Sequence, residues 1–276
     1  MDAEQYTVSA KEKGVKLLDF LAQRLGISNK AAKGLLNARH VFVNRKRIWM
    51  ARHALNVSDL VEIVPHDSKP AESTIATLYE DDDYIIVNKP AATLSSGPRS
   101  LEERLQREAG ANWPRCAHRI DKDTTGCLLL ARHAEALAAA MLLFKRHKLK
   151  KSYRALVFGT LQLKEQTLKA PIGGEHAISH VRVLDTNREA THVTVRTETG
   201  RTHQIRKHMS GIGHAVIGDR QYGSRSKQSE KLVKVGRQML HAYELQLKSP
   251  ISGEMIRAKA PLPHDFRRTL RLFHLT

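Results

Sequence analysis

The hydrophobic pattern at the start of the chain predicts a small unit of two helices and short strands. "VKLLDFLAQRLG" places four leucines at helical spacing and ends at Gly26, a residue suited to a helix C-cap. Ser28 suits the N-cap of a second helix, "NKAAKGLLNA". The runs "VFVNRKRI", which turns at Asn44, and "DLVEIV" are typical of short strands. We therefore expect an α+β unit over residues 1–64.

A polar, proline-containing segment, "PHDSKPAEST", covers residues 65–74 and predicts a linker. The elements beyond it, in 75–276, are longer. "DYIIVNKP", "CLLLAR", "SYRALVFG" and "THVTVRTET" predict strands, and "HAYELQL" with "EMIRAKA" predicts a hairpin. Ser100 and Glu103 form a capping-box signature before one helix, and "AEALAAAMLLFKRH" predicts another. Because strands and helices follow no regular βαβ order, we expect an α+β fold with a mixed, largely antiparallel sheet flanked by helices.

The charge balance indicates a polyanionic partner. The 276 residues include 46 Lys and Arg but only 28 Asp and Glu, which gives a net charge of +18. A field of this sign favours nucleic acid first and anionic membrane second. The longest apolar run, "ALAAAMLLF", is far shorter than the roughly 20 residues of a spanning helix, and the first ten residues lack the order of a signal peptide. We therefore expect no membrane partner. Two cysteines without CxxC spacing fit a reduced compartment, so we expect a cytoplasmic protein.

Many of the cations crowd into the first unit. A solvated basic surface is one explanation, but so many positive charges on two short helices and a hairpin indicate a surface that contacts phosphates. These cations are Lys30, Lys33, Arg39, Arg45, Lys46, Arg47 and Arg52.

The stretch "HRIDKDTTG" could be a turn, a calcium loop or the site of a catalytic carboxylate. An EF-hand loop beginning at Asp121 would need glutamate at its twelfth position, where Arg132 stands. Zinc has no support either, because HExxH and paired-cysteine spacings are absent and His203 and His208, five residues apart, fall on different helix faces. We therefore expect no metal.

Three side chains remain as candidates for chemistry. If "RCAHRI" is a strand, Arg119 and Asp121 face the same side, and Asp121 lies where the strand opens into a loop. Tyr153 begins a later strand, and Arg206 lies in a short helix, "GRTHQIRKHM", after a glycine turn. Spacing alone does not show whether these residues converge.

The segments "HRIDKDTTGCLLLA", "KKSYRALVFG", "TGRTHQIRKHM", "GHAVIGDRQYG" and "MLHAYELQL", in this order, resemble the RluA-type family of pseudouridine synthases. The resemblance runs from about Leu78 to the C-terminal "APLP" and implies that 75–276 is the catalytic domain. Ile120, Thr125 and Ala92 depart mildly from the usual leucine, serine and glycine. Residues 1–64 resemble the S-four-type (alpha-L) RNA-binding module, although "VFVNRKRIW" lacks its usual hairpin glycine.

The resemblance implies an enzyme that breaks the bond between ribose C1′ and uracil N1, turns the base and rejoins it through C5, without a cofactor or metal. It makes Asp121 the essential carboxylate, acting as a nucleophile at C1′ or as a base that gives a glycal intermediate. Arg206 would pair with Asp121 and stabilise its charge. Tyr153 would stack on the uracil and is the candidate for removing the C5 proton.

The resemblance also implies base flipping, with Arg119 filling the space that the extruded base leaves. The expected partner is structured RNA, with large-subunit ribosomal RNA favoured over transfer RNA, and the expected oligomeric state is a monomer. A noncatalytic RNA-binding protein and a DNA-binding regulator remain alternatives. The candidate RNA-binding residues are Arg119, Lys89, Arg201, His203, Lys30, Lys33, Arg39, Arg45, Lys46 and Arg47.

Overall fold

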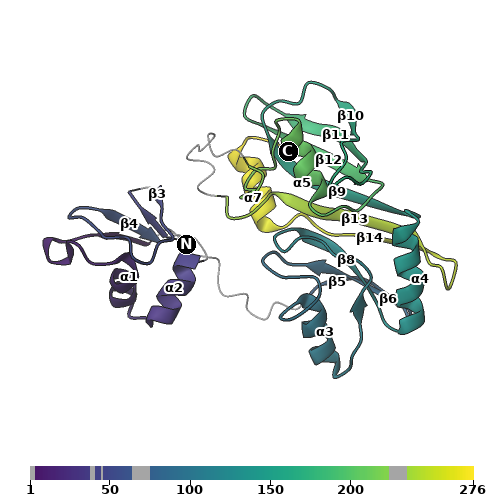
Figure 1. Cartoon of the computed structure of the whole chain (residues 1–276), viewed down its shortest axis with the longest axis horizontal. Coiled ribbons are helices and arrows are strands. Elements are labelled where there is room, and N and C mark those ends of the chain that lie inside the picture. The colour runs from purple at the N-terminus through teal and green to yellow at the C-terminus, as the bar shows by residue number, and fades with distance from the viewer. Residues whose placement is uncertain (1–3, 38–40, 45, 64–74, 224–234) are drawn as a thin grey trace. The chain divides into compact units, whose positions relative to one another are not determined.

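The computed structural model describes residues 4–37, 41–44, 46–63, 75–223 and 235–276. The chain forms two compact units, Met1–Ser73 and Thr74–Thr276 (Figure 1). We describe each unit by itself, as the N-terminal and the C-terminal unit.

The N-terminal unit contains an antiparallel four-stranded sheet in the order β1-β4-β2-β3, together with two α-helices. Its elements are β1 (Glu4–Thr7), the 3-10 helix η1 (Ala10–Glu12), α1 (Leu17–Leu25), α2 (Asn29–Asn37), β2 (Val41–Val43), β3 (Lys46–Arg47) and β4 (Leu60–Ile63). The predicted capping residues are confirmed. Gly26 ends α1 in the left-handed conformation at φ 62°, and Ser28 Oγ accepts a hydrogen bond from the Ala31 amide at 3.2 Å. The strand β1 and the helix η1 were not predicted.

The core of the N-terminal unit forms where the apolar faces of both helices meet the sheet. Leu17 and Leu21 of α1 are fully buried, with Leu36 of α2 and Val41 and Val61 of the sheet in the same cluster. Burial of a leucine side chain contributes about 1.5–3 kcal/mol, so a few such residues stabilise even a small unit.

The C-terminal unit is built on a ten-stranded sheet. Its elements are β5 (Thr77–Glu80), β6 (Tyr84–Lys89), α3 (Leu101–Ala109), β7 (Arg115–Cys116), β8 (Thr125–Ala131), α4 (Ala134–Lys145), β9 (Leu149–Phe158), β10 (Glu165–Leu168), β11 (Ser179–Thr186), β12 (Ala190–Thr197), α5 (Gln204–Gly211), β13 (Leu240–Lys248), β14 (Met255–Lys259) and α7 (His264–Leu272). The main strand order is β10-β11-β12-β9-β13-β8-β6-β5, with β14 beside β13 and β7 beside β8. Among the pairs that the structure describes, β13 with β8 is parallel and the others are antiparallel, which confirms the predicted α+β fold.

Helices cover both faces of the sheet, because alternate residues of a strand point to opposite sides. Along the fully buried β8, Leu128 packs in a cluster with Leu101 of α3, whereas Leu129 packs with Ala136 of α4. The strand β9 is divided in the same way: Leu156 clusters with residues of α7, and the neighbouring residues cluster with α5. The central strands therefore lie in a three-layer core (Figure 1).

The strand predicted from "RCAHRI" is wrong beyond its first two residues. The strand β7 covers Arg115–Cys116 only, and the chain then forms a loop that carries Asp121. The physical reason is that a side chain replaces a backbone partner of β8. The amide of Leu129 donates to Nε2 of His118 at 3.0 Å, where a longer β7 would have offered a backbone carbonyl. Asp121 is therefore placed by a turn, in which its carbonyl accepts from the Thr124 amide at 3.0 Å, and not by strand alternation.

In the described part of the chain, no helix combines the length and the apolar character needed to cross a bilayer.

Candidate active site

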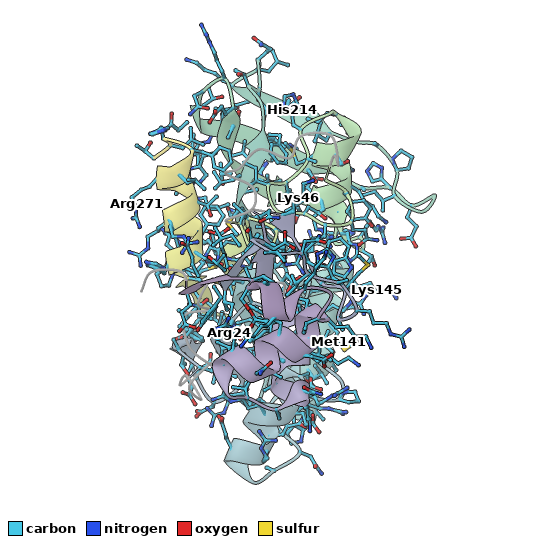
Figure 2. The ribbon with its side chains drawn as sticks, turned by 90° about the vertical axis from the view of Figure 1, so that its left-hand side faces the viewer. Arg24, Lys46, Met141, Lys145, His214 and Arg271 are labelled. Carbon is cyan, nitrogen blue, oxygen red and sulfur yellow. The ribbon has the colours of Figure 1, made fainter. Side chains whose placement is uncertain are left out.

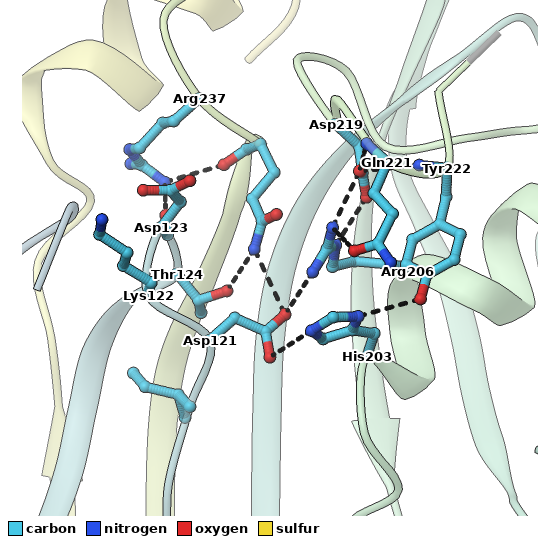
Figure 3. A network of polar contacts seen from close by, with 12 residues as sticks. Asp121, Lys122, Asp123, Thr124, His203, Arg206, Asp219, Gln221, Tyr222 and Arg237 are labelled. Atoms are coloured by element: carbon cyan, nitrogen blue, oxygen red, sulfur yellow. Dashed lines mark hydrogen bonds and ion pairs between the residues drawn. The ribbon is translucent and has the colours of Figure 1, made fainter. Parts of the chain in front are cut away.

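The side chain of Asp121 is held by hydrogen bonds at one oxygen, and His203 lies near the other oxygen. Its Oδ2 accepts hydrogen bonds from Arg206 Nη1 at 3.1 Å and from Gln238 Nε2 at 3.4 Å (Figure 3). The side chain keeps 24% of its surface exposed. The three sequence candidates Asp121, Tyr153 and Arg206 all line one cavity of about 550 Å³. This volume is in the range of pockets that take a small organic ligand.

Arg206 reaches Asp121 with a guanidinium that other groups hold in place. Its Nε and Nη2 donate to the two carboxylate oxygens of Asp219 at 2.6 and 3.0 Å, and its Cζ atom lies 5.0 Å from the centre of the Tyr222 ring. Asp219 is fully buried and also accepts from the backbone amides of Gln221 and Tyr222. Burial would raise the pKa of Asp219, but the hydrogen bonds from Arg206 and from these amides outweigh it and lower the pKa.

The start of α5 explains why Arg206 points to this place. Gln204, the first residue of the helix, is buried, and its Oε1 accepts from Thr199 Oγ1 at 2.7 Å and from the Arg201 amide at 3.0 Å. Its Nε2 donates to the carbonyl of Ile178 at 2.8 Å. These bonds fix the first turn of the helix, and Arg206 is two residues further on.

The loop of Asp121 is also anchored to the segment before β13. Gln238 Nε2 donates to Thr124 Oγ1 at 2.9 Å, and Arg237 Nη1 donates to the carbonyl of Asp123 at 3.0 Å. Arg237 is itself held by two hydrogen bonds to Asp265, at 2.6 and 3.0 Å. A rigid support of this kind keeps a catalytic group in one geometry.

Tyr153 lines the cavity from β9 and is half-buried. Burial raises its pKa well above the ordinary value for a phenol, and the negative charge of Asp121 raises it further. The phenol is therefore neutral in the free protein, and its ring offers a flat, polarisable surface to a ligand.

Three of the predicted RNA-binding residues lie at this cavity. Arg119 is exposed at its edge. His203 donates or accepts through Nδ1 with the hydroxyl of Tyr222 at 3.0 Å, and its Nε2 lies 3.8 Å from Oδ1 of Asp121. Arg201 donates from Nε to the carbonyl of His176 at 3.0 Å and forms an ion pair with Glu175.

The prediction that Lys89 contacts RNA is wrong. Lys89 is 0% exposed, and its Nζ donates to the carbonyls of Pro90, Thr93 and Lys122 at 2.9, 2.7 and 3.0 Å. Because its Nζ is buried among these three carbonyls, Lys89 cannot reach a phosphate. It instead ties the segment after β6 to the residue that follows Asp121.

The predicted cations of the N-terminal unit are exposed where the structure describes them. Lys30 and Lys33 lie on α2. Lys46, which Figure 2 labels, lies on β3. Arg47 belongs to β3, while Arg39 and Arg45 lie outside the described residues.

Three residues that support the site, Asp219, Gln238 and Arg237, had no predicted role. The sequence offered one sign of a role for Asp219. Its carboxylate directly follows the run "HAVIG", and a carboxylate buried with such a run needs a partner of opposite charge. Gln238 and Arg237 had no such sign, because the residues of the Asp121 loop that they contact lie more than 100 residues earlier in the chain. Among the described residues, no group of three or more His, Cys, Asp or Glu side chains is arranged to hold a metal ion.

The chain is similar to known RNA-modifying proteins. A family model described as RNA pseudouridylate synthase matches residues 83–211. The chain is 35% identical over 226 residues to "Ribosomal large subunit pseudouridine synthase D" of Pseudomonas aeruginosa, with 71% of this chain and 70% of that protein covered. It is 31% identical over 303 residues to the protein of the same name from Pasteurella multocida, with 95% and 93% covered. A solved structure, "Human RNA Pseudouridylate Synthase Domain Containing 1", superimposes with a TM-score of 0.61 at 26% identity, over 70% of this chain and 86% of that one.

The chain is therefore an RNA pseudouridine synthase, an isomerase that converts uridine to pseudouridine in RNA. The chain belongs to the RluA-type family of RNA pseudouridine synthases.

Proposed function

We propose that this enzyme isomerises specific uridines in structured RNA, with large-subunit ribosomal RNA as the target and Asp121 as the essential carboxylate. The observation that carries the proposal is the geometry of Asp121, which faces a cavity of about 550 Å³ while Arg206 donates to its Oδ2 at 3.1 Å. The names of the relatives from P. aeruginosa and P. multocida support the ribosomal target.

In the proposed reaction the bond from C1′ to N1 breaks, the uracil turns, a bond from C1′ to C5 forms, and the C5 proton leaves while N1 gains one. Asp121 starts this sequence, either by attacking C1′ or by removing a ribose proton to give a glycal. Both routes need a carboxylate that keeps its charge in a partly dry site. Arg206 stabilises that charge, and Asp219 keeps Arg206 in position.

Tyr153 stacks on the uracil in this proposal and accepts the C5 proton. Because its raised pKa keeps the phenol protonated, the phenol oxygen can take the C5 proton only as its own hydroxyl proton passes to another group. Asp121, whose charge contributes to that raised pKa, is the suitable acceptor.

The target base must leave its stack to enter the cavity. We propose that Arg119, exposed at the cavity edge, occupies the space that the base leaves, because a planar guanidinium can both stack and hydrogen-bond. Flipping costs a few kcal/mol for a paired base and less for a base in a loop, which favours a partly unpaired target.

The N-terminal unit supplies further contacts to RNA in this proposal, as an S-four-type module. Its two-helix and sheet arrangement presents the exposed cations Lys30, Lys33 and Lys46. Neutralising phosphates with such cations adds affinity that falls steeply with salt.

Mapping pseudouridines in total RNA from cells with and without the gene tests the proposal. We expect one or more positions in large-subunit ribosomal RNA to lose the modification, and to regain it with the unchanged gene but not with Asp121→Asn. Loss of positions in transfer RNA alone would overturn the ribosomal target. Full restoration by Asp121→Asn would overturn the role of the carboxylate.

A further inference from the structure

Lys151 is a buried cation on the cavity wall that the proposed chemistry does not use. It lies on β9, two residues before Tyr153, and both side chains line the cavity because residues two apart on a strand share a face. Only 8% of Lys151 is exposed. Its Nζ donates to the carbonyl of Thr199 at 3.0 Å and lies 6.0 Å from the centre of the Phe144 ring.

The ammonium of Lys151 has donors to spare and no carboxylate to balance it. An ammonium carries three protons, and the Thr199 carbonyl takes one of them. Among the described residues, no carboxylate forms an ion pair with Lys151, and burial alone lowers its pKa to about 8. A buried cation without a counter-charge costs folding free energy, so its position on a ligand cavity points to an acceptor brought by the ligand.

The position of Lys151 along β9 indicates which part of a nucleotide it would meet. The strand β13 runs antiparallel to β9, so the residues just before β13 lie toward the later part of β9. Asp121 bonds to one of these, Gln238, at 3.4 Å. Tyr153 and then Lys151 follow in order away from Asp121, about 7 Å apart at strand spacing. The charge of Asp121 raises the pKa of Tyr153 but does not contribute to that of Lys151, as this order requires.

We propose that Lys151 recognises the base as uracil by donating a hydrogen bond to the carbonyl oxygen opposite the glycosidic bond. This inference rests on the proposed function, in which C1′ lies at Asp121 and the ring lies on Tyr153. The ring atom opposite N1 is C4, so the C4 oxygen of the stacked uracil points along β9 toward Lys151.

The symmetry of uracil allows the same contact after the reaction. When the base turns about the line through N3 and C6, N1 exchanges places with C5, and the C4 carbonyl exchanges places with the C2 carbonyl. A carbonyl oxygen therefore faces Lys151 in uridine and again in pseudouridine. Cytosine carries an amino group at C4, which would bring a donor against the ammonium. A site built to hydrogen-bond one group rejects an analogue that leaves its buried donor unpaired.

The test is the affinity of the full chain for four pentanucleotides of sequence AAXAA, in which X is uridine, pseudouridine, cytidine or 4-thiouridine. An unpaired strand removes the cost of base flipping, and the four probes differ only in the base. The unchanged protein should bind the uridine and pseudouridine probes alike, and roughly 10-fold more tightly than the cytidine probe. The 4-thiouridine probe should bind more weakly than uridine, because sulfur is a poorer acceptor.

Lys151→Met keeps the length of the side chain but removes its donors, so it should bind uridine and cytidine equally. Lys150→Met is the matched control, since Lys150 lies on the same strand and is exposed, and it should keep the full preference. A preference that survives Lys151→Met, or its absence in the unchanged protein, would overturn the proposal. The 4-thiouridine probe tests the same contact in the unchanged protein, so it does not depend on whether Lys151→Met folds. Equal affinity of the unchanged protein for uridine and 4-thiouridine would also overturn the proposal. Pseudouridine formation in RNA together with a base preference that is independent of Lys151 would leave the proposed function standing and remove only this inference.

Discussion

Arg206 and Asp219 form a two-bond ion pair inside the C-terminal unit, with Nε to Oδ2 at 2.6 Å and Nη2 to Oδ1 at 3.0 Å. The remaining terminal nitrogen of Arg206 is thereby aimed at Asp121. The Arg206–Asp219 pair therefore contributes to the stability of the C-terminal unit and also positions the group that contacts Asp121.

We expect Asp219→Asn to destabilise the protein and to slow catalysis. Breaking a buried ion pair costs about 3–5 kcal/mol, and Asp121 compensates the charge of Arg206 only in part, so the loss should lie toward the lower end of this range. The amide can no longer accept at both oxygens, so Arg206 loses its fixed orientation. Urea unfolding and single-turnover pseudouridine formation measure the two effects.

Glu244→Gln is the matched control, because Glu244 pairs with Arg257 at the surface. An exposed pair contributes about 0–1 kcal/mol, so this variant should unfold at nearly the parent urea concentration. Equal destabilisation by both variants would show that the buried pair has no special role.

Lys89 should give the protein a stability that rises with pH. Burial lowers the pKa of Lys89 to about 7, against 10.5 for an ordinary lysine. Between these values the unfolded chain binds a proton that the folded protein does not, so the free energy of unfolding increases with pH, by at most about 1.4 kcal/mol per pH unit. We expect Lys89→Met to reduce this rise between pH 7 and 10, with a remaining contribution above pH 8 from Lys151, whose pKa burial lowers to about 8.

The measurement is urea unfolding across that pH range, with Lys148→Met as the exposed control. The control should keep the slope of the parent protein. If Lys89→Met retains the same slope, the buried lysine is charged throughout and the assignment is wrong. The Lys89 variant should also lose activity, because its three carbonyl contacts hold the chain beside Asp121.

Gly126→Ala should destabilise the parallel pairing of β8 with β13. Gly126 has φ +110°, and a Cβ there would lie 2.2 Å from the carbonyl oxygen of Ala242. Backbone strain and the clash together should cost about 2–5 kcal/mol. Gly97→Ala is the control, since Gly97 has φ +91° in open space and should lose only about 1–2 kcal/mol. Similar losses at both positions would contradict the close approach.

The N-terminal cations should appear in the salt dependence of RNA binding. Replacing Lys30, Lys33 and Lys46 with Gln in the full chain should reduce the slope of log affinity against log salt by about 2, because each lost phosphate contact removes roughly 0.7–0.9. Filter binding from low to moderate salt measures the slope. Lys11→Gln with Lys13→Gln is the control, as both residues are exposed outside α2 and β3. An unchanged slope in the triple variant would remove the N-terminal unit from the RNA interface.

Local signals in the sequence were sufficient for the elements that local chemistry determines. Gly26 and Ser28 cap helices in the structure as they were predicted to do. The strand "RCAHRI" failed because the His118 side chain takes the hydrogen bond that a strand would have used. No pattern of alternation records such a substitution.

For the site, too, the sequence indicated some residues and missed the contacts between segments that are far apart in the chain. Asp121, Tyr153 and Arg206 were candidates from their places in predicted elements, and the family resemblance supplied their expected roles. The structure brings all three to one cavity. Lys89 was misassigned because composition shows that a lysine is basic but not where its ammonium lies. The supporting contact of Gln238 joins segments 117 residues apart, a separation that no local pattern can reveal.

Tritium release from RNA labelled at uridine C5 is the most direct test of the central role of Asp121, because the C5 proton leaves only after the glycosidic bond has been broken and remade. The unchanged protein should release tritium from its target, whereas Asp121→Asn should fold and bind the same RNA but release none above background. Release by the asparagine variant at a rate near that of the parent would contradict the account.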